Sequence, residues 1–373
     1  MSSIRLTTSE KMLLALLKAS LNEQDPEVSC FEGVASDDWK ECAQLAKSQG
    51  VLALAWEGVC RLPQNMQPYQ NLKISWALAV EKYERKYARY CSTVNELSEL
   101  YQAHGIKMVQ LKGVGLSTYY PIPSHREGGD IDIYTYSASP DRISDKDANA
   151  LADSLIEEMG IAVDRCHPKH SHFDYKGIPI ENHKTFLDID RCALSSKMEA
   201  ELHDCIDPQE RTLQENESIL IPSDRFNILF VATHALAHYG RGMALHHLYD
   251  WACLIKSCEL IIPAHLQERH FMRGINAMTL LCNEYLGTSA KDVKDYSMAE
   301  EMLLEILHPF DDNAYPESGA AEYIRFKWRR FNHTNRTRDL FLHTPWWKNK
   351  AFWEKLTKSV RWHLEAPKRI FKK

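Results

Sequence analysis

Hydrophobic residues change their spacing twice along the chain, and the two changes divide it into three regions. Up to about residue 104 they recur at helical spacing, and the stretch 68–103 has no internal Gly or Pro, which predicts one long helix. Between about residues 106 and 190, short runs alternate between apolar and polar positions, as β-strands do. Beyond about residue 194 the helical spacing returns.

The middle region predicts a small mixed sheet and one helix. Its strands are expected at 106–111, 130–136, 161–166, 171–176 and 178–190. The helix is expected from Asp145 to Met159, and Lys176-Gly177 is expected to form a hairpin turn. In the third region, Ser223-Asp224 is expected to cap a helix that runs to about Tyr239.

These elements predict the α+β fold class, with a small mixed-sheet module flanked by two helical regions. The expected domain boundaries are 1–104 for the N-terminal helical region, 105–193 for the sheet module and 194–373 for the C-terminal helical domain. Segments as long as these are within the usual range of domain sizes.

Composition is that of a soluble globular protein, with 44% hydrophobic and 26% charged residues. No apolar run is long enough to span a bilayer, and the N-terminus lacks the pattern of a signal peptide. The ten cysteines contain no CxxC pair, which favours reduced thiols over a disulfide framework. We therefore expect a cytoplasmic protein without a membrane span.

The net charge of −6 is unevenly distributed, because the segment from Ala321 onward carries a net +11 with interleaved aromatic residues. Such a tail could bind an anionic partner such as nucleic acid, a phosphorylated acceptor or lipid headgroups. It could equally be a terminal helix whose aromatic side chains pack on the acidic body of the protein. We favour packing, because Phe352, Trp353 and Trp362 do not form a continuous stripe.

The strand expected at 130–136 carries the clearest chemical signal. Asp130 and Asp132 lie one residue apart, so alternation directs both carboxylates to one face, which we expect to be open to solvent until metal binds. Two adjacent carboxylates repel each other and require a cation, and oxygen ligands on a strand suit Mg²⁺. Upstream, Lys112-Gly113-Val114-Gly115 follows a strand and precedes a helix, where backbone amides can approach phosphate oxygens. Together these features predict a nucleotide–metal site.

Two-metal phosphoryl transfer also requires a third carboxylate, to bind the acceptor-side metal or to take the acceptor proton. The residues alone leave Glu181, Asp188 and Asp190 open for this part. Lys112 and Arg126 are natural phosphate partners, although Lys112 could instead pair with a neighbouring acid and Arg126 could anchor its loop to the paired acids. The basic segment that precedes the hairpin could meet the triphosphate or be solvated; it contains His167, Lys169, His170 and His172.

The ordered motifs resemble a bacterial family of uncharacterised nucleotidyltransferases, within the superfamily that shares the catalytic fold of DNA polymerase β. The matching elements are Leu111-Lys112-Gly113, Tyr120-Pro121, Arg126 and Gly129-Asp130-Ile131-Asp132. The resemblance extends more weakly through Glu181-Asn182-His183 and a later helix with His234, His238 and Asp250. One departure is the turn, where the superfamily usually has Gly-Ser and a shorter gap before the acids, whereas this chain has Gly113-Val114.

The resemblance implies a role for each matching residue. The catalytic residues and metal ligands would be Asp130, Asp132 and Glu181, the last as the acid of an E-x-H element. Nucleotide binding would involve Lys112, Gly113, Arg126 and Gly129. The positions that would support these residues or contact the acceptor are His183, His234, His238 and Asp250.

His234 and His238 have a second interpretation, because histidines four residues apart on one helix face can bind zinc. The sequence places no further ligand beside them, so we favour a core or helix-contact role. Asp250 is expected to be a buried organiser rather than a catalytic acid.

The resemblance therefore implies a Mg²⁺-dependent nucleotidyltransferase with a two-ion site, and Mn²⁺ as the alternative metal. It would move a nucleoside monophosphate from an NTP, by default ATP, to an unidentified acceptor and release pyrophosphate. Sugars, small molecules, peptides and proteins are open as acceptors, and RNA is a weaker candidate. The alternatives are a non-catalytic nucleotide-binding or scaffold protein on the same fold, or a toxin-like modifier of tRNA or protein. The three acids argue against the first, and only the basic tail supports the second.

Overall fold

The structure is a computed structural model. It describes residues 5–139, 143–187, 193–214, 217–239, 242–290, 296–309 and 322–329, together with residues 353, 357 and 361. The alternative third acids Asp188 and Asp190 lie outside the described residues, as does most of the basic C-terminal segment.

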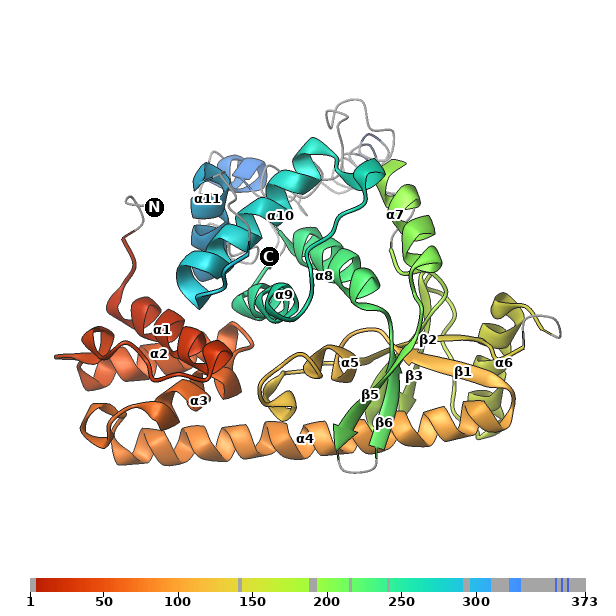
Figure 1. Ribbon diagram of the computed structural model, residues 1–373, viewed down its shortest axis with the longest axis horizontal. Helices are drawn as coiled ribbons and strands as arrows, with labels where there is room; N and C mark the ends of the chain where they lie inside the picture. Colours follow the sequence, from red (N-terminus) through yellow and green to blue (C-terminus); the bar gives the residue numbers. More distant parts are fainter. Residues whose placement is uncertain are drawn as a thin grey trace.

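The N-terminal region is helical, as its apolar spacing predicted. Its elements are α1 (Thr8–Asn22), η1 (Val28–Phe31), α2 (Ser36–Ser48), α3 (Leu52–Arg61), η2 (Gln64–Met66) and α4 (Gln70–Ala103). The 34-residue α4 is uninterrupted and spans about 50 Å. It runs along one edge of the molecule, below α1–α3 at one end and below the strands at the other (Figure 1). Gly105 follows it with a φ of +73°, a left-handed conformation that favours glycine.

The sheet module begins directly after α4. Its elements are β1 (Ile106–Gln110), α5 (Val114–Ser117), η3 (Pro123–His125), β2 (Ile131–Ser137), α6 (Asp145–Glu158), β3 (His170–Tyr175) and β4 (Ile178–His183). The four strands form a mixed sheet in the order β1-β2-β4-β3, in which only β2 and β4 are parallel. Lys176 and Gly177 both have positive φ and form the tight turn between β3 and β4, as predicted.

Side-chain alternation divides the two faces of β2 between two cores. Ile131 and Ile133 point into the core that the sheet shares with α6 and the later part of α4. Tyr134 points to the opposite face, into the larger core that joins the N-terminal and C-terminal helices. Asp132 has the same parity as Tyr134 and therefore lies between the sheet and the C-terminal helices.

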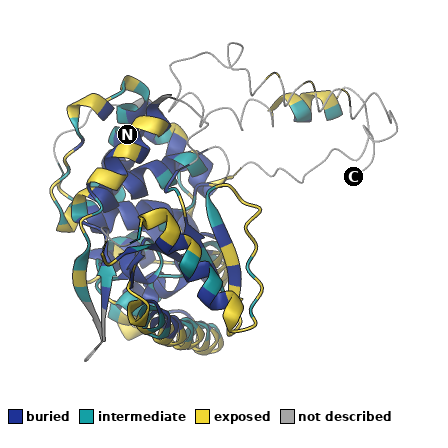
Figure 2. Ribbon diagram, turned by 90° about the vertical axis from the view of Figure 1, so that its right-hand side faces the viewer, coloured by how far each residue is buried: buried dark blue, intermediate teal, exposed yellow. Residues whose placement is uncertain are grey.

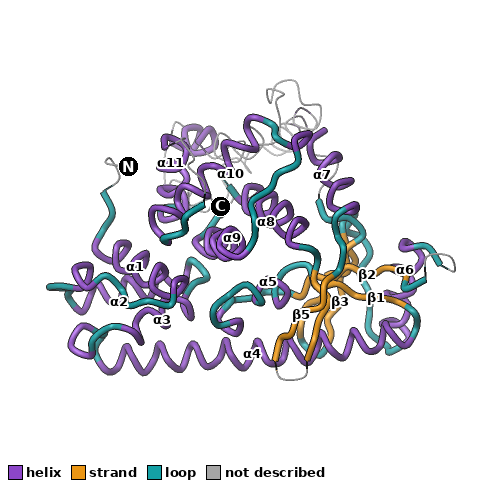
Figure 3. The backbone as a smooth tube through the Cα atoms, viewed as in Figure 1, coloured by secondary structure: helices purple, strands orange, loops and turns teal. Residues whose placement is uncertain are grey.

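The C-terminal region contains a hairpin as well as helices. Its elements are α7 (Ala193–Asp204), β5 (Gln209–Gln214), β6 (Glu217–Ile221), α8 (Asp224–His238), α9 (Leu245–Ser257), η5 (Ala264–Leu266), α10 (Arg269–Leu281), the π-helical η6 (Cys282–Leu286) and α11 (Tyr296–Leu307). The strands of the molecule gather over one end of α4 (Figure 3). Buried residues line the inward faces of the packed helices (Figure 2). In the described part of the chain, no helix is both long and apolar enough to cross a membrane.

The fold class predicted from the sequence is confirmed: the protein is α+β, with a small four-stranded mixed sheet between helical regions. Three predicted elements differ in detail. The strand expected at 161–166 is reduced to one bridge between Asp164 and His172, because the Asp164 carboxylate accepts the Cys166 amide and turns the chain away. The last strand of the module ends at His183 rather than near residue 190. The prediction that the C-terminal region is wholly helical was also wrong, since β5 and β6 form an antiparallel pair there.

Candidate active site

The pairing of β2 with β4 brings two acids together that lie far apart in the sequence. Because the two strands are parallel and in register, Glu181 lies directly beside Asp132. One oxygen of each carboxylate and one ring nitrogen of His183 all lie within 4.8 Å of one another. Asp130 directly precedes β2, and the charges of Asp132 and Glu181 contribute to raising its pKa, after burial. All three predicted acids therefore gather at one end of this strand pair.

Lys112 supplies a cation to this group of acids. Its Nζ lies 3.0 Å from Asp132 Oδ1, and its side chain is 15% exposed. Burial by itself would lower the pKa of Lys112, but the charges of Asp132, Asp130 and Glu181 raise it above its usual value. Lys112 is therefore charged, and it pairs with a neighbouring acid, which was one of its two predicted roles.

The two strand acids have different environments, which corrects the expectation of a common solvent-facing position. Asp132 is only 2% exposed, and both Lys112 and His183 contact it; Lys112 in turn lies over the Phe230 ring of helix α8. Burial by itself would raise the pKa of Asp132, but Lys112 and His183 hold it well below its usual range. Asp130 is half-buried, and burial together with the charge of Asp132 raises its pKa.

His183 joins the acids and is entirely buried. Its Nε2 lies 2.9 Å from Asp132 Oδ1 and 3.6 Å from Glu181 Oε2, while its Nδ1 lies 3.2 Å from the Thr185 carbonyl oxygen. The His183 hydrogen bond, acting against burial, lowers the pKa of Glu181. His170 approaches the same Glu181 oxygen at 3.6 Å from β3. Two imidazoles, from His183 and His170, thus orient the Glu181 carboxylate. His170 belongs to the basic segment before the hairpin, so this segment reaches the acids through His170.

The glycine turn between β1 and α5 packs closely against β1 and Asp130. A Cβ at Gly115 would lie 2.6 Å from the Gln110 carbonyl oxygen, so no larger residue fits there without a shift of the backbone. Gly113 has a φ of +51°, and a Cβ there would lie 3.4 Å from the Asp130 carbonyl oxygen. The turn is therefore held against the segment that carries the acids.

Helix α4 fixes the loop that leads into β2. The Tyr90 hydroxyl donates to the Gly129 carbonyl at 2.8 Å, and Lys86 Nζ donates to the Gly128 carbonyl at 2.5 Å. Both donors come from a helix that precedes the motif by about forty residues in sequence. The position of Asp130 thus depends on α4 as well as on its own strand.

Arg126 anchors its loop through Asp250 of α9. Its Nε and Nη2 donate to the two Asp250 carboxylate oxygens at 2.8 and 2.9 Å, and its Nη1 donates to the Gly113 carbonyl at 3.3 Å. The Tyr120 hydroxyl donates to Asp250 Oδ1 at 2.6 Å. The sequence predicted either phosphate binding or a loop anchor for Arg126, and in the structure Arg126 anchors its loop. Its partner is Asp250 and not the paired acids Asp130 and Asp132. Asp250 is the buried organiser that the sequence analysis expected.

His234 and His238 of α8 lie beside His247 of α9, with ring centroids 4.6 to 5.6 Å apart. The charges of Lys112 and Asp132 act on His234, so this group borders the acids. Sequence analysis identified two of the three histidines. His247 was missed because no local spacing relates the start of α9 to α8.

Comparison with known proteins identifies the family. The sequence model of the family described as uncharacterised nucleotidyltransferase matches residues 35–287, which is more than half of the chain. The chain belongs to this family. No curated protein matches it.

Family membership agrees with the resemblance seen in the motifs and supports nucleotidyl transfer as the general activity, with an NTP as substrate. The matched range of this nucleotidyltransferase contains every residue of the group around Asp132 and also the three histidines of α8 and α9. Both groups therefore belong to the part of the chain that defines the family.

Proposed function

We propose that this nucleotidyltransferase moves a nucleoside monophosphate from an NTP to an acceptor hydroxyl or phosphate in a Mg²⁺-dependent reaction. The observation that carries the proposal is the position of Glu181 beside Asp132 on neighbouring parallel strands, with Asp130 directly before the same strand and subject to the charge of both. Three carboxylates that converge in this way repel one another and are costly to fold unless cations join them.

The residues of this group fit magnesium. Carboxylate oxygens are the donors that Mg²⁺ and Mn²⁺ prefer, and Asp130, Asp132 and Glu181 would supply them. His183 and His170 would orient the carboxylates through the contacts described above. Held by these carboxylates, magnesium would supply positive charge to neutralise the triphosphate and the developing charge of the reaction.

The side chains have separate parts in the transfer. Lys112 holds a positive charge beside the acids, where it would meet the phosphates of the nucleotide. The acceptor oxygen forms a bond to the α-phosphorus, the bond from that phosphorus to pyrophosphate breaks, and Glu181 takes the acceptor proton. Glu181 suits this part because its side chain is 24% exposed, whereas Asp132 is covered.

A nucleotide-binding experiment tests the proposal before the acceptor is known. ATP and the other NTPs are added to the full-length protein with Mg²⁺ or with EDTA, and the melting temperature and calorimetric affinity are measured. At a hundredfold excess over its dissociation constant, an NTP with Mg²⁺ should stabilise the protein by about 2.7 kcal/mol. EDTA should remove most of this effect. Equal stabilisation with and without metal would contradict the carboxylate site and favour a nucleotide-binding protein without catalysis.

The part assigned to Glu181 has its own test. Glu181→Gln should lower turnover, measured as pyrophosphate release, by about a hundredfold or more while NTP affinity changes little. Glu158→Gln is the matched control, because Glu158 is an exposed acid of the same module. Asp188→Asn and Asp190→Asn should be milder than Glu181→Gln. A larger loss in either of these two variants would move the third acid to that position.

A further inference from the structure

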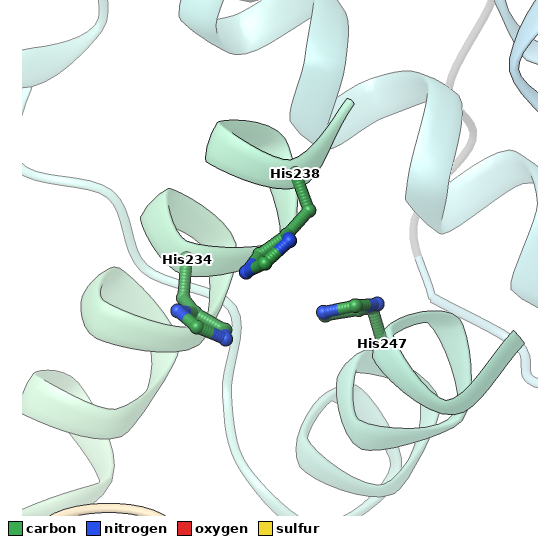
Figure 4. Close-up of side chains that lie close together, drawn as sticks. All are labelled: His234, His238 and His247. Atoms are coloured by element: carbon green, nitrogen blue, oxygen red, sulfur yellow. The ribbon is translucent and has the colours of Figure 1, made fainter. Parts of the chain in front are cut away.

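Three imidazole rings from two helices face a common point. His234 and His238 are one helical turn apart on α8, and His247 lies in the first turn of α9. The three ring edges point toward one another across the gap between the helices (Figure 4). The ring centroids are 4.7, 5.6 and 4.6 Å apart, and one nitrogen of each ring lies within 4.8 Å of the others.

These distances match those of a three-histidine metal centre. Zinc binds imidazole nitrogen at about 2.0–2.1 Å, so tetrahedral geometry places the ligand nitrogens about 3.3 Å apart and the ring centroids about 5 Å apart. The three nitrogens lie within 4.8 Å of one another and would come together by rotation of the side chains to reach that spacing.

The position of the three rings suits a metal ion. Each residue offers an imidazole nitrogen, a donor that binds a metal through its lone pair. His247 is buried, whereas His234 and His238 are partly exposed, which leaves a path for an ion.

We propose that His234, His238 and His247 form a binding site for a divalent transition metal of the zinc type, separate from the carboxylate site. Imidazole nitrogens prefer zinc and its neighbours in the first transition row, whereas the oxygen donors of Asp130, Asp132 and Glu181 prefer magnesium. The histidine site would therefore select zinc-type ions and the carboxylate site would select magnesium. Among the described residues three ligands are available, which leaves one tetrahedral position for water or an acceptor atom.

His247 must change its tautomer when it binds. Its Nδ1 accepts the Ala244 amide at 3.1 Å, which places the ring hydrogen on Nε2 in the metal-free form. Coordination through Nε2 requires the hydrogen to move to Nδ1. The cost of binding is thus the loss of one helix-capping contact.

Cobalt spectroscopy of the full-length protein tests the site directly. The protein is stripped with a chelator, dialysed and titrated with Co²⁺, which absorbs strongly in the visible range when it is four-coordinate. We expect one equivalent of Co²⁺ to produce these bands and Zn²⁺ to abolish them by competition. A wild-type protein without such bands, and without zinc retained after dialysis, would overturn the proposal whatever the variants do.

Variants then locate the metal. His238→Gln and His247→Gln should each weaken Zn²⁺ binding by more than the roughly 10- to 100-fold cost of losing an outer-shell partner. His246→Gln is the matched control, because His246 contacts the His247 ring but is not one of the three converging histidines. Equal loss in His246→Gln and in the other two variants would contradict the assignment.

Asp132→Asn separates this site from the proposed function. It should retain the cobalt bands and lose the Mg²⁺-dependent stabilisation by NTP, because only the carboxylate site contains Asp132. If the bands disappeared with Asp132→Asn or with the more stable Asp130→Asn, while the circular dichroism spectrum stayed that of wild type, the metal would lie among the carboxylates and the histidine site would be wrong. The proposed nucleotidyl transfer would be unaffected by that outcome.

Discussion

At the scale of single residues, the site depends on a buried charge pair. Lys112 and Asp132 are 3.0 Å apart, and water reaches neither freely. Removing one partner of such a pair leaves the other charge without compensation in a medium of low polarity. The stability of the fold therefore depends on two residues of the candidate active site, Lys112 and Asp132.

Asp132→Asn should destabilise the protein by about 3–5 kcal/mol, because Lys112 would remain charged and buried without its partner. Asp130→Asn should be neutral or stabilising, since burial and the charge of Asp132 already raise the pKa of Asp130. Urea denaturation in EDTA measures both effects. The double variant Lys112→Met with Asp132→Asn should recover part of the loss. Equal stability of Asp132→Asn and wild type would show that the pair contributes nothing.

Single residues also mark where sequence reasoning succeeds. The alternation of a strand places Asp132 opposite Ile131 and Ile133, and this relation depends only on the local backbone. The burial of Asp132 could not be predicted from its own strand, because its contacts are Lys112, which follows β1, and His183, which ends β4 about fifty residues further along the chain. The four-residue spacing on one helix likewise predicts that His234 and His238 lie on the same face. That His247 lies beside them could not be predicted, because it depends on the packing of α8 on α9.

At the scale of elements, short segments around the site are fastened to helices far away in sequence. His125 at the end of η3 lies between two acids, with Nδ1 2.7 Å from Glu57 Oε1 of α3 and Nε2 3.1 Å from Glu84 Oε1 of α4. Burial would lower the pKa of His125, but these two carboxylates raise it. The three elements are therefore joined most strongly when the imidazole is protonated.

This raised pKa predicts a dependence of stability on pH. A histidine whose folded-state pKa exceeds the unfolded value of about 6.5 contributes fully below that pH, and the contribution is lost as pH rises through the folded value. Wild type should therefore lose more stability than His125→Gln between about pH 6 and about pH 9. His104→Gln, at an exposed histidine, should keep the wild-type slope. If the unfolding free energy of His125→Gln changed with pH as steeply as that of wild type, the pH dependence would not come from His125.

The Arg126–Asp250 pair fastens the loop before β2 to α9 and gives a second prediction at this scale. Asp250→Ala should cost about 3–5 kcal/mol, because it leaves a buried guanidinium without its bidentate partner. Arg126→Lys should not behave as a conservative change, since an ammonium group cannot make both contacts. Arg85→Gln, at an exposed pair within α4, should change stability by less than about 1 kcal/mol. Urea denaturation ranks the three, and similar values for all of them would contradict the anchor.

Elements differ in how far the sequence predicts them. The long α4 and the turn at Lys176-Gly177 follow from local rules, namely the absence of helix breakers and the need for positive φ. The pair β5–β6 does not, because its strands are polar and short, and they become ordered by burying Ile219 and Ile221 in a core made by α4 and the sheet. Tertiary packing rather than local preference decides such a segment.

At the scale of the whole molecule, one large core crosses all three predicted domains. It contains Leu13 of α1, Val109 of β1 and Trp251 of α9, together with many neighbours. Because this core is shared, the sheet module lacks a complete hydrophobic interior of its own. The domain boundaries predicted from the sequence thus separate segments of chain that fold around common contacts.

We expect the described parts to unfold together. Far-ultraviolet circular dichroism and tryptophan fluorescence should give coincident urea transitions, since Trp76 of α4 and Trp251 of α9 are both buried in this one core. A fragment of residues 105–193 should be largely unfolded by the same measures. Two separate transitions, or a fragment that folds cooperatively, would instead support independent domains.

The pair between Lys112 and Asp132 has a consequence for the history of the family. A descendant that no longer needs catalysis could not discard Asp132 alone without a large loss of stability, because the buried lysine would lose its direct ion-pair partner. Inactivation that preserves the fold is expected to replace both residues in the same lineage, whereas Asp130 can change freely. Relatives that lack the second acid should therefore carry an uncharged residue at the lysine position, and the two columns of a family alignment should vary together.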